Sequence, residues 1–193
     1  MKQFKQFFRY VGVLTMVGLL AACAPALKQP AGQDDGTYSR AGRFALNVWD
    51  KTIDRNKESV QGGFLWLDTR QKLDLDLRNP LGSTLARVSV TQDRATLVHA
   101  DGSQVSADNP DALVAEVLGS EIPVAGLRYW LKGIVAPVAV EQEQRDAQGN
   151  LGSFTQAGWK VTLSDYDHKG PRKLGMVRNE TMQTITVRLV INE

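Results

Sequence analysis

Residues 73–78 read Leu-Asp-Leu-Asp-Leu-Arg, and this stretch indicates the fold class of the chain. Successive side chains of a β-strand point to opposite sides of the sheet, so the three leucines share one face. The intervening Asp74, Asp76 and Arg78 share the other face, and we expect their charged groups to lie in solvent. The stretch predicts an antiparallel strand with one apolar and one wet face.

The same two-residue period recurs along the chain from residue 39 onward. Rows of this kind occupy residues 44–48, 88–90, 161–163 and 185–191. Turn signals such as Asp101-Gly102 and Gln148-Gly149-Asn150 separate them. We count ten or eleven strands joined mostly by short hairpins, which predicts a mainly β protein with an antiparallel, meandering sheet. A sheet of this many strands must curl or close.

One region, residues 108–133, follows a helical pattern instead. Asn109 and Pro110 are typical of a helix start, and Gly119 is typical of a helix end. A second amphipathic stretch covers residues 124–132 and stops before Gly133. Two short amphipathic helices must bury their apolar faces, and the concave side of a curved sheet is the available partner. The pattern is compatible both with a filled core and with a lined cavity.

The first 22 residues are typical of a secretory leader. Lys2, Lys5 and Arg9 precede an apolar stretch at residues 11–20 that is too short to span a bilayer as a helix. Leu20-Ala21-Ala22-Cys23 resembles the lipobox of bacterial lipoproteins. That resemblance implies cleavage before Cys23 and acylation of this residue, whereas the alternative is an ordinary signal peptide.

The lipobox resemblance also implies a location and a division of the chain. Ala24, rather than Asp, follows the cysteine, which in lipoproteins implies attachment to the outer membrane, facing the periplasm. We expect the leader at residues 1–22, the lipidated N-terminus and a flexible Pro/Gly-rich tether at 23–38, and a β-barrel domain at 39–193. Two or more acyl chains hold a protein stably on a membrane, which one short chain does not.

Composition excludes several classes of function. Three of the 23 basic residues fall in the leader, which leaves 20 against 21 acidic residues, so nucleic-acid binding by bulk charge is excluded. A single cysteine excludes a disulfide framework, and two isolated histidines argue against a metal site. Neither His99 nor His168 stands in a catalytic pattern, so we expect no enzyme, no metal and no cofactor.

The loop at residues 78–84 carries an unusual residue at its tip. Pro80 and Gly82 flank a single large apolar side chain, Leu81, although loop tips are normally polar. One interpretation is that Leu81 folds back on its own hairpin; the other is a functional role for this side chain.

Candidate cavity-lining residues follow from the apolar rows and the second helix. On the strands they are Leu46, Trp66, Leu75 and Val88, and in the helical stretch they are Leu127, Trp130 and Leu131. Periodicity groups such residues on one face but does not say which face looks inward.

Several motifs, in order along the chain, resemble the LolB family. They are the lipobox, a strand row around Arg43-Phe44, Asn79-Pro80-Leu81-Gly82-Ser83-Thr84, Ile122-Pro123, Leu127-Arg128-x-Trp130 with Gly133, and Gly158-Trp159-Lys160-Val161. The match covers roughly residues 39–191 and implies an incomplete antiparallel β-barrel of about eleven strands with helices over an apolar cavity. The family usually has a helix before its first strand, where this chain has a Pro/Gly-rich tether.

The resemblance further implies a receptor that accepts triacylated lipoproteins from a periplasmic LolA-like carrier and inserts them into the outer membrane. In the family, the leucine matching Leu81 protrudes and is needed for insertion but not for acceptance. Pro80, Leu81 and Gly82 would then form a membrane-insertion loop acting on outer-membrane lipids. We expect a monomer. Two alternatives remain: a lipocalin-like binder of a small hydrophobic ligand, and a structural envelope lipoprotein with a filled core.

Overall fold

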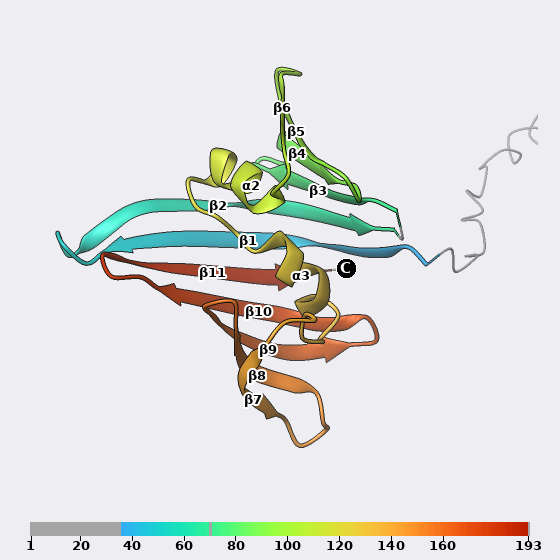
Figure 1. Ribbon diagram of the computed structural model, residues 1–193, viewed down its shortest axis with the longest axis vertical. Coiled ribbons are helices and arrows are strands. Elements are labelled where there is room, and N and C mark those ends of the chain that lie inside the picture. Colours follow the sequence, from blue (N-terminus) through green and yellow to red (C-terminus); the bar gives the residue numbers. More distant parts are fainter. Residues whose placement is uncertain (1–35, 70, 193) are drawn as a thin grey trace, which may run out of the picture. The chain divides into compact units, whose positions relative to one another are not determined.

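The computed structural model describes residues 36–69 and 71–192, so Cys23, the leader and most of the tether lie outside the described residues. This part of the chain forms one antiparallel sheet of eleven strands with two short helices, as Figure 1 shows. The strands are β1 (Tyr38–Asp50), β2 (Arg55–Asp68), β3 (Leu73–Arg78), β4 (Thr84–Val90), β5 (Ala95–His99), β6 (Gln104–Ala107), β7 (Val140–Arg145), β8 (Leu151–Gln156), β9 (Trp159–Asp167), β10 (Gly170–Asn179) and β11 (Gln183–Ile191).

The strand order explains why the barrel is open. Neighbours in the sheet run β6-β5-β4-β3-β2-β1-β11-β10-β9-β8-β7, so β6 and β7 are the two edges and do not pair with each other. The first and last strands meet at the centre, where β1 pairs with both β2 and β11. Apart from the pairing of β1 with β11, every pair of neighbouring strands is consecutive in sequence and forms a hairpin. The predicted mainly β, incomplete antiparallel barrel is confirmed.

The chain crosses from one sheet edge to the other through its helices, α2 (Pro110–Leu118) and α3 (Val124–Trp130), which lie between β6 and β7 in sequence. The Asn109 side chain caps α2 by accepting the Asp111 N–H at 2.9 Å, and Gly119 ends it at φ 72°, as predicted. The helix α3 ends two residues before the predicted Lys132, because the last turn tightens to hydrogen bonds from residue i to residue i−3. Neither helix is long and apolar enough to cross a membrane.

The core lies on the side of the sheet that the helices cover. Leu73, Leu75 and Leu77 are all buried, as the alternation in residues 73–78 predicts. The expectation that Asp76 lies in solvent is wrong, because only 4% of this residue is exposed. Arg87 stands opposite it on β4 and donates two hydrogen bonds to its carboxylate, at 2.5 and 2.8 Å. These charge-assisted hydrogen bonds from the neighbouring strand replace the hydrogen bonds that water would make to an exposed carboxylate.

Candidate functional site

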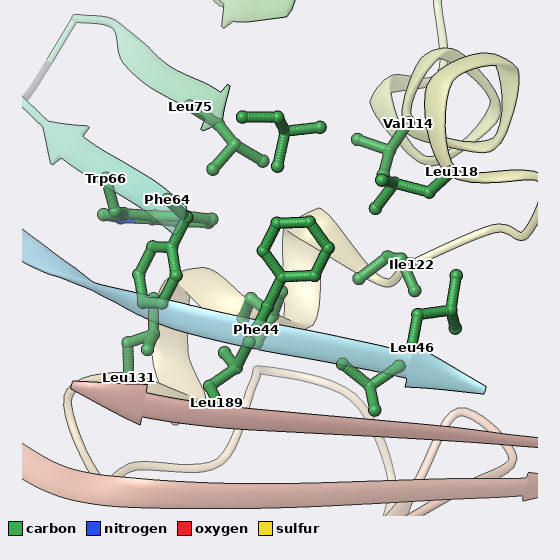
Figure 2. Close-up of a pocket in the computed structure, with 13 residues that line it drawn as sticks. Phe44, Leu46, Phe64, Trp66, Leu75, Val114, Leu118, Ile122, Leu131 and Leu189 are labelled. Carbon is green, nitrogen blue, oxygen red and sulfur yellow. The ribbon is translucent and has the colours of Figure 1, made fainter. Parts of the chain in front are cut away.

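An apolar pocket lies between the concave side of the sheet and the two helices (Figure 2). Alternate residues of the central strands point into it, because a strand presents every second side chain to the same face. Thirteen side chains line it, and all are apolar: Phe44, Leu46, Phe64, Trp66, Leu75, Leu77, Val114, Leu118, Ile122, Leu127, Leu131, Val187 and Leu189. Such a lining suits a hydrocarbon ligand and offers no polar partner to a charged one.

Most of the candidate lining residues meet in this pocket, but two do not. Leu46, Trp66, Leu75, Leu127 and Leu131 all line it.

Val88 and Trp130 are completely buried outside the lining. The indole of Trp130 is directed toward β8, where its Nε1 donates to Gln156 Oε1 at 2.8 Å and its ring meets Phe154 edge to face. Sequence reasoning did not select the other eight lining residues, which are Phe44, Phe64, Leu77, Val114, Leu118, Ile122, Val187 and Leu189. Four of these, Phe44, Leu77, Val187 and Leu189, nevertheless stand in period-two rows that the sequence shows.

The pocket is nearly filled by the side chains that line it. Its open space is about 40 Å³. One water molecule needs about 10–15 Å³ by this kind of measure, so only a few small molecules would fit. An acyl chain of about 16 carbons is far larger than that space, since each methylene adds its own volume. A ligand of that size enters only if part of the pocket wall moves.

The helix α3 is fastened to the sheet by ion pairs at its C-terminal end. The Asp68 carboxylate, at the end of β2, accepts hydrogen bonds from the Arg128 guanidinium at 2.6 and 3.0 Å and from Lys132 Nζ at 3.0 Å. Asp68 is buried, whereas the two cations are about one-third exposed. Tyr38 adds a hydrogen bond of 2.5 Å from its hydroxyl to the Leu131 carbonyl. The pocket wall formed by α3 is therefore anchored from β1 and β2.

A second ion pair supports this anchor. The fully buried guanidinium of Arg40 donates two hydrogen bonds, at 2.7 and 2.8 Å, to the carboxylate of Asp167 at the end of β9. Its Nε also donates to the Tyr38 hydroxyl at 3.0 Å. The hydrogen bonds from Arg40 hold the pKa of Asp167 well below its usual range. Burial raises the pKa of Tyr38, so this phenol remains a neutral donor to the helix end.

Gln156 fixes the segment that follows α3. Its Oε1 accepts from Trp130 Nε1 and from the Ala136 N–H, while its Nε2 donates to the Ala136 and Val138 carbonyls. The side chain is buried and uses both ends of its amide, as a buried polar group must.

The helix α2 is held differently, mainly by apolar packing. Leu113, Val114 and Leu118 are its buried side chains, and it packs over β4, β5 and β6. An exposed contact of 3.3 Å joins His99 on β5 to Glu116.

Asp111 links the two helices, because its carboxylate accepts the Val124 N–H at 2.8 Å. Burial raises the pKa of Asp111. Of the two helical walls of the pocket, α2 has fewer polar ties to the sheet.

The hairpin between β3 and β4 presents Leu81 to solvent. The Asn79 side chain accepts the N–H groups of Leu81 and Ser83, both at 3.0 Å, and Gly82 has a φ of 90° that favours glycine. This turn leaves Leu81 92% exposed, so the side chain does not fold back on its own hairpin. Pro80 and Gly82 flank it within the same turn.

These features define a class of protein: an open antiparallel β-barrel in which two helices cover an apolar pocket. A family model described as outer membrane lipoprotein LolB matches residues 36–193. The chain is 47% identical to the outer-membrane lipoprotein LolB of Bordetella petrii, over 92% of this chain and 89% of the relative. It is 36% identical to the protein of that name from Cupriavidus pinatubonensis, over 90% and 88%.

The chain belongs to the LolB family of outer-membrane lipoproteins. Membership agrees with the lipid-anchored location in the outer membrane that the lipobox implies. The family is one of lipoprotein localisation factors.

Proposed function

We propose that this protein accepts the acyl chains of lipoproteins from a periplasmic carrier and passes them into the outer membrane. The observation that carries the proposal is the pocket lined by thirteen apolar side chains beneath two helices. A site that must bind any lipoprotein recognises what all of them share, which is hydrocarbon. Apolar surface without polar groups is suited to that task.

Energetics explain why a pocket is needed. Leaving one acyl chain of about 16 carbons in water costs on the order of 13 kcal/mol, at about 0.8 kcal/mol for each methylene. Lipoproteins therefore pass from one apolar site to the next without entering solvent. Transfer runs downhill if the pocket binds the chains more tightly than the carrier does, and the bilayer more tightly than the pocket.

Acceptance requires the pocket to open, because the present space of about 40 Å³ is too small for an acyl chain. The contacts favour α2 as the moving wall. It relies on apolar packing and an exposed His99–Glu116 contact, whereas α3 is anchored through the buried Asp68 carboxylate. An incoming chain replaces the packing contacts of α2 with contacts of its own.

Leu81 is proposed to act in the second step, delivery to the membrane. Burial of one leucine contributes about 1.5–3 kcal/mol, which is too little to anchor the protein. The acyl chains proposed on Cys23 supply the anchor. Leu81, exposed at the hairpin tip, inserts among lipid headgroups and loosens their packing where the cargo enters.

The test of acceptance uses the chain from position 23 with Cys23→Ala, so that no acyl anchor complicates the assay. It is mixed with purified carrier loaded with a labelled triacylated lipoprotein, and each protein is then captured separately. We expect the label to move to this protein. Label that stays on the carrier, with folding verified by circular dichroism, contradicts the proposal. A small lipid that co-purifies while no label moves favours a lipocalin-like binder. If no label moves and no lipid co-purifies, the result favours a structural lipoprotein.

A further inference from the structure

A second hollow lies on the other face of the sheet. Arg43 and Ala45 line it, and they alternate along β1 with Phe44 and Leu46, which point into the apolar pocket. The volume of this groove is about 590 Å³. Its charged side chains are Arg43, Arg78 and Arg188, and no carboxylate of the described residues lines it. The two hollows therefore differ in charge, although Phe44 borders both of them.

Strand register brings these arginines together. Gly63 on β2 pairs with Arg43 on one side and with Arg78 on the other. Strands lie about 4.7–4.9 Å apart, so the Cα atoms of the two arginines are about 10 Å apart, with a residue lacking a side chain between them. Arg188 on β11 stands opposite Ala45, two residues beyond Arg43. The small residues Gly63 and Ala45 keep the floor of the groove open between the cations.

The three guanidinium groups have few ion-pair or hydrogen-bond partners among the described residues. Within residues 36–69 and 71–192, the side chains of Arg43 and Arg188 form no ion pair or hydrogen bond. Arg78 approaches Asp76 only at 3.8 Å, and that carboxylate already binds Arg87 more closely. The buried Nε of Arg78 has no partner in the described part of the chain. Arg43 and Arg188 thus have no anion among the described residues, and Arg78 has only a distant share of the Asp76 carboxylate.

The groove ends at the hairpin that exposes Leu81. Asn79, Pro80 and Gly82 line that end, so the arginines and the hairpin tip belong to one continuous surface. Val190, which is 47% exposed, adds a further apolar group to the lining. Cations beside exposed apolar side chains are the combination that suits the interface of a membrane, where phosphates lie above hydrocarbon.

We propose that this groove binds the phosphate group of a membrane phospholipid through Arg43, Arg78 and Arg188. The planar guanidinium group donates paired hydrogen bonds to phosphate oxygens, and two such groups on either side of Gly63 can clasp one headgroup. Binding there sets the sheet against the bilayer with the Leu81 hairpin directed to the lipid. The site lies on the opposite face from the acyl pocket and binds lipid whether or not cargo is present.

The test measures binding of the Cys23→Ala chain from position 23 to sedimented vesicles of phosphatidylglycerol and phosphatidylcholine. The double variant Arg43→Gln/Arg188→Gln removes two cations from the groove. Arg94→Gln/Lys160→Gln is the matched control, since it removes the same charge from exposed sites outside the groove. We expect the groove variant to bind phosphatidylglycerol vesicles about tenfold more weakly, with a much smaller loss for the control.

A third variant tests the shape of the groove without changing its charge. Gly63→Leu places a side chain between the two arginines, and its Cβ meets only ordinary contacts of 3.6 and 3.7 Å, so the sheet should accept it. We expect weaker vesicle binding with an unchanged thermal unfolding midpoint. Equal losses for the groove and control variants overturn the proposal, as does unaltered binding by Gly63→Leu. The proposal is also overturned if millimolar inorganic phosphate displaces the protein from the vesicles, because the groove would then be a site for free phosphate without a preference for lipid.

These variants also keep the lipid site distinct from the proposed function. Arg43, Arg188 and Gly63 do not line the acyl pocket, so transfer of labelled lipoprotein from the carrier should continue in all of them. Loss of vesicle binding with intact transfer supports the headgroup site. Intact vesicle binding with no transfer instead contradicts the receptor.

Discussion

The pocket and the β3–β4 hairpin use the same residue type in opposite environments. Leu46 on β1 is completely buried and lines the pocket, whereas Leu81 at the hairpin tip is 92% exposed. Leu46 belongs to a period-two row that turns it toward the core, and Leu81 stands in a turn organised by Asn79. The difference in burial predicts that stability depends on Leu46 and not on Leu81, so we expect any role of Leu81 to lie outside stability.

The largest stability effect is expected from shortening the buried leucine. Leu46→Ala removes buried methyl groups and leaves a cavity, which should lower the free energy of unfolding by about 2–5 kcal/mol. Leu81→Ala removes a side chain that is in water in the folded state, so the change should stay within about 0.5 kcal/mol. Denaturant unfolding of both variants measures the contrast, and similar losses would contradict the two environments.

A smaller loss is expected when the anchor of α3 is removed. Asp68→Ala leaves Arg128 and Lys132 without their shared carboxylate, which should cost about 1–3 kcal/mol, because both cations keep partial access to water. Lys173→Ala is the control, since its pair with Asp165 at 3.4 Å is exposed on both sides and should contribute about 0–0.5 kcal/mol. Thermal unfolding compares the two, and an equal effect would show that α3 is not anchored there.

Acid should lower the stability of the protein by protonating Asp167, the partner of Arg40. The hydrogen bonds from Arg40 lower the pKa of Asp167 in the folded protein, so the unfolded chain binds more protons at this carboxyl in acid. The stability it contributes is complete above the unfolded pKa of about 4 and is lost as the pH falls below it. Asp167→Asn should therefore be less stable at pH 7 and lose less stability between about pH 4 and pH 2. Urea unfolding at several pH values across this range measures the free energy of unfolding of both proteins. If that free energy falls equally with pH in the unaltered protein and in Asp167→Asn, the assignment is contradicted.

The smallest effect on stability, with the largest on delivery, is expected at the hairpin tip. Leu81→Glu should leave unfolding and acceptance of cargo unchanged but slow the appearance of labelled lipoprotein in vesicles, because a carboxylate does not enter the headgroup layer readily. Met182→Glu is the matched control, since Met182 is exposed in the turn between β10 and β11. Equal delivery by Leu81→Glu and the unaltered protein would remove any special role for Leu81.

Local patterns predicted the sheet and the helices because period and capping are local properties. The alternation in residues 73–78 and the Asn109–Pro110 helix start both hold in the structure. The bridge from Arg40 to Asp167 joins residues 127 positions apart, and no local pattern indicates it. Asp76 looked solvent-exposed because the sequence does not show that register places Arg87 beside it.

The sequence predicted the apolar character of the pocket but not which residues line it. Alternation identifies apolar faces, but depth within the sheet decides which side chains reach the pocket. Val88 and Trp130 are as buried as Leu46 and nevertheless lie outside its lining. The arginine groove depends on Gly63 pairing with two different strands, which requires the register of β1, β2 and β3.

Trp66 allows the most direct test of acyl-chain binding in the pocket. It lines the pocket, and its buried Nε1 has no hydrogen-bond partner among the described residues, so Trp66→Phe removes the fluorophore without breaking a bond. Trp159→Phe is the control, because Trp159 is buried outside the lining. The measurement is tryptophan fluorescence during addition of a triacylated lipopeptide with brominated acyl chains. The account predicts quenching that Trp66→Phe largely abolishes and Trp159→Phe retains; quenching unaffected by Trp66→Phe, or none at all, would contradict it.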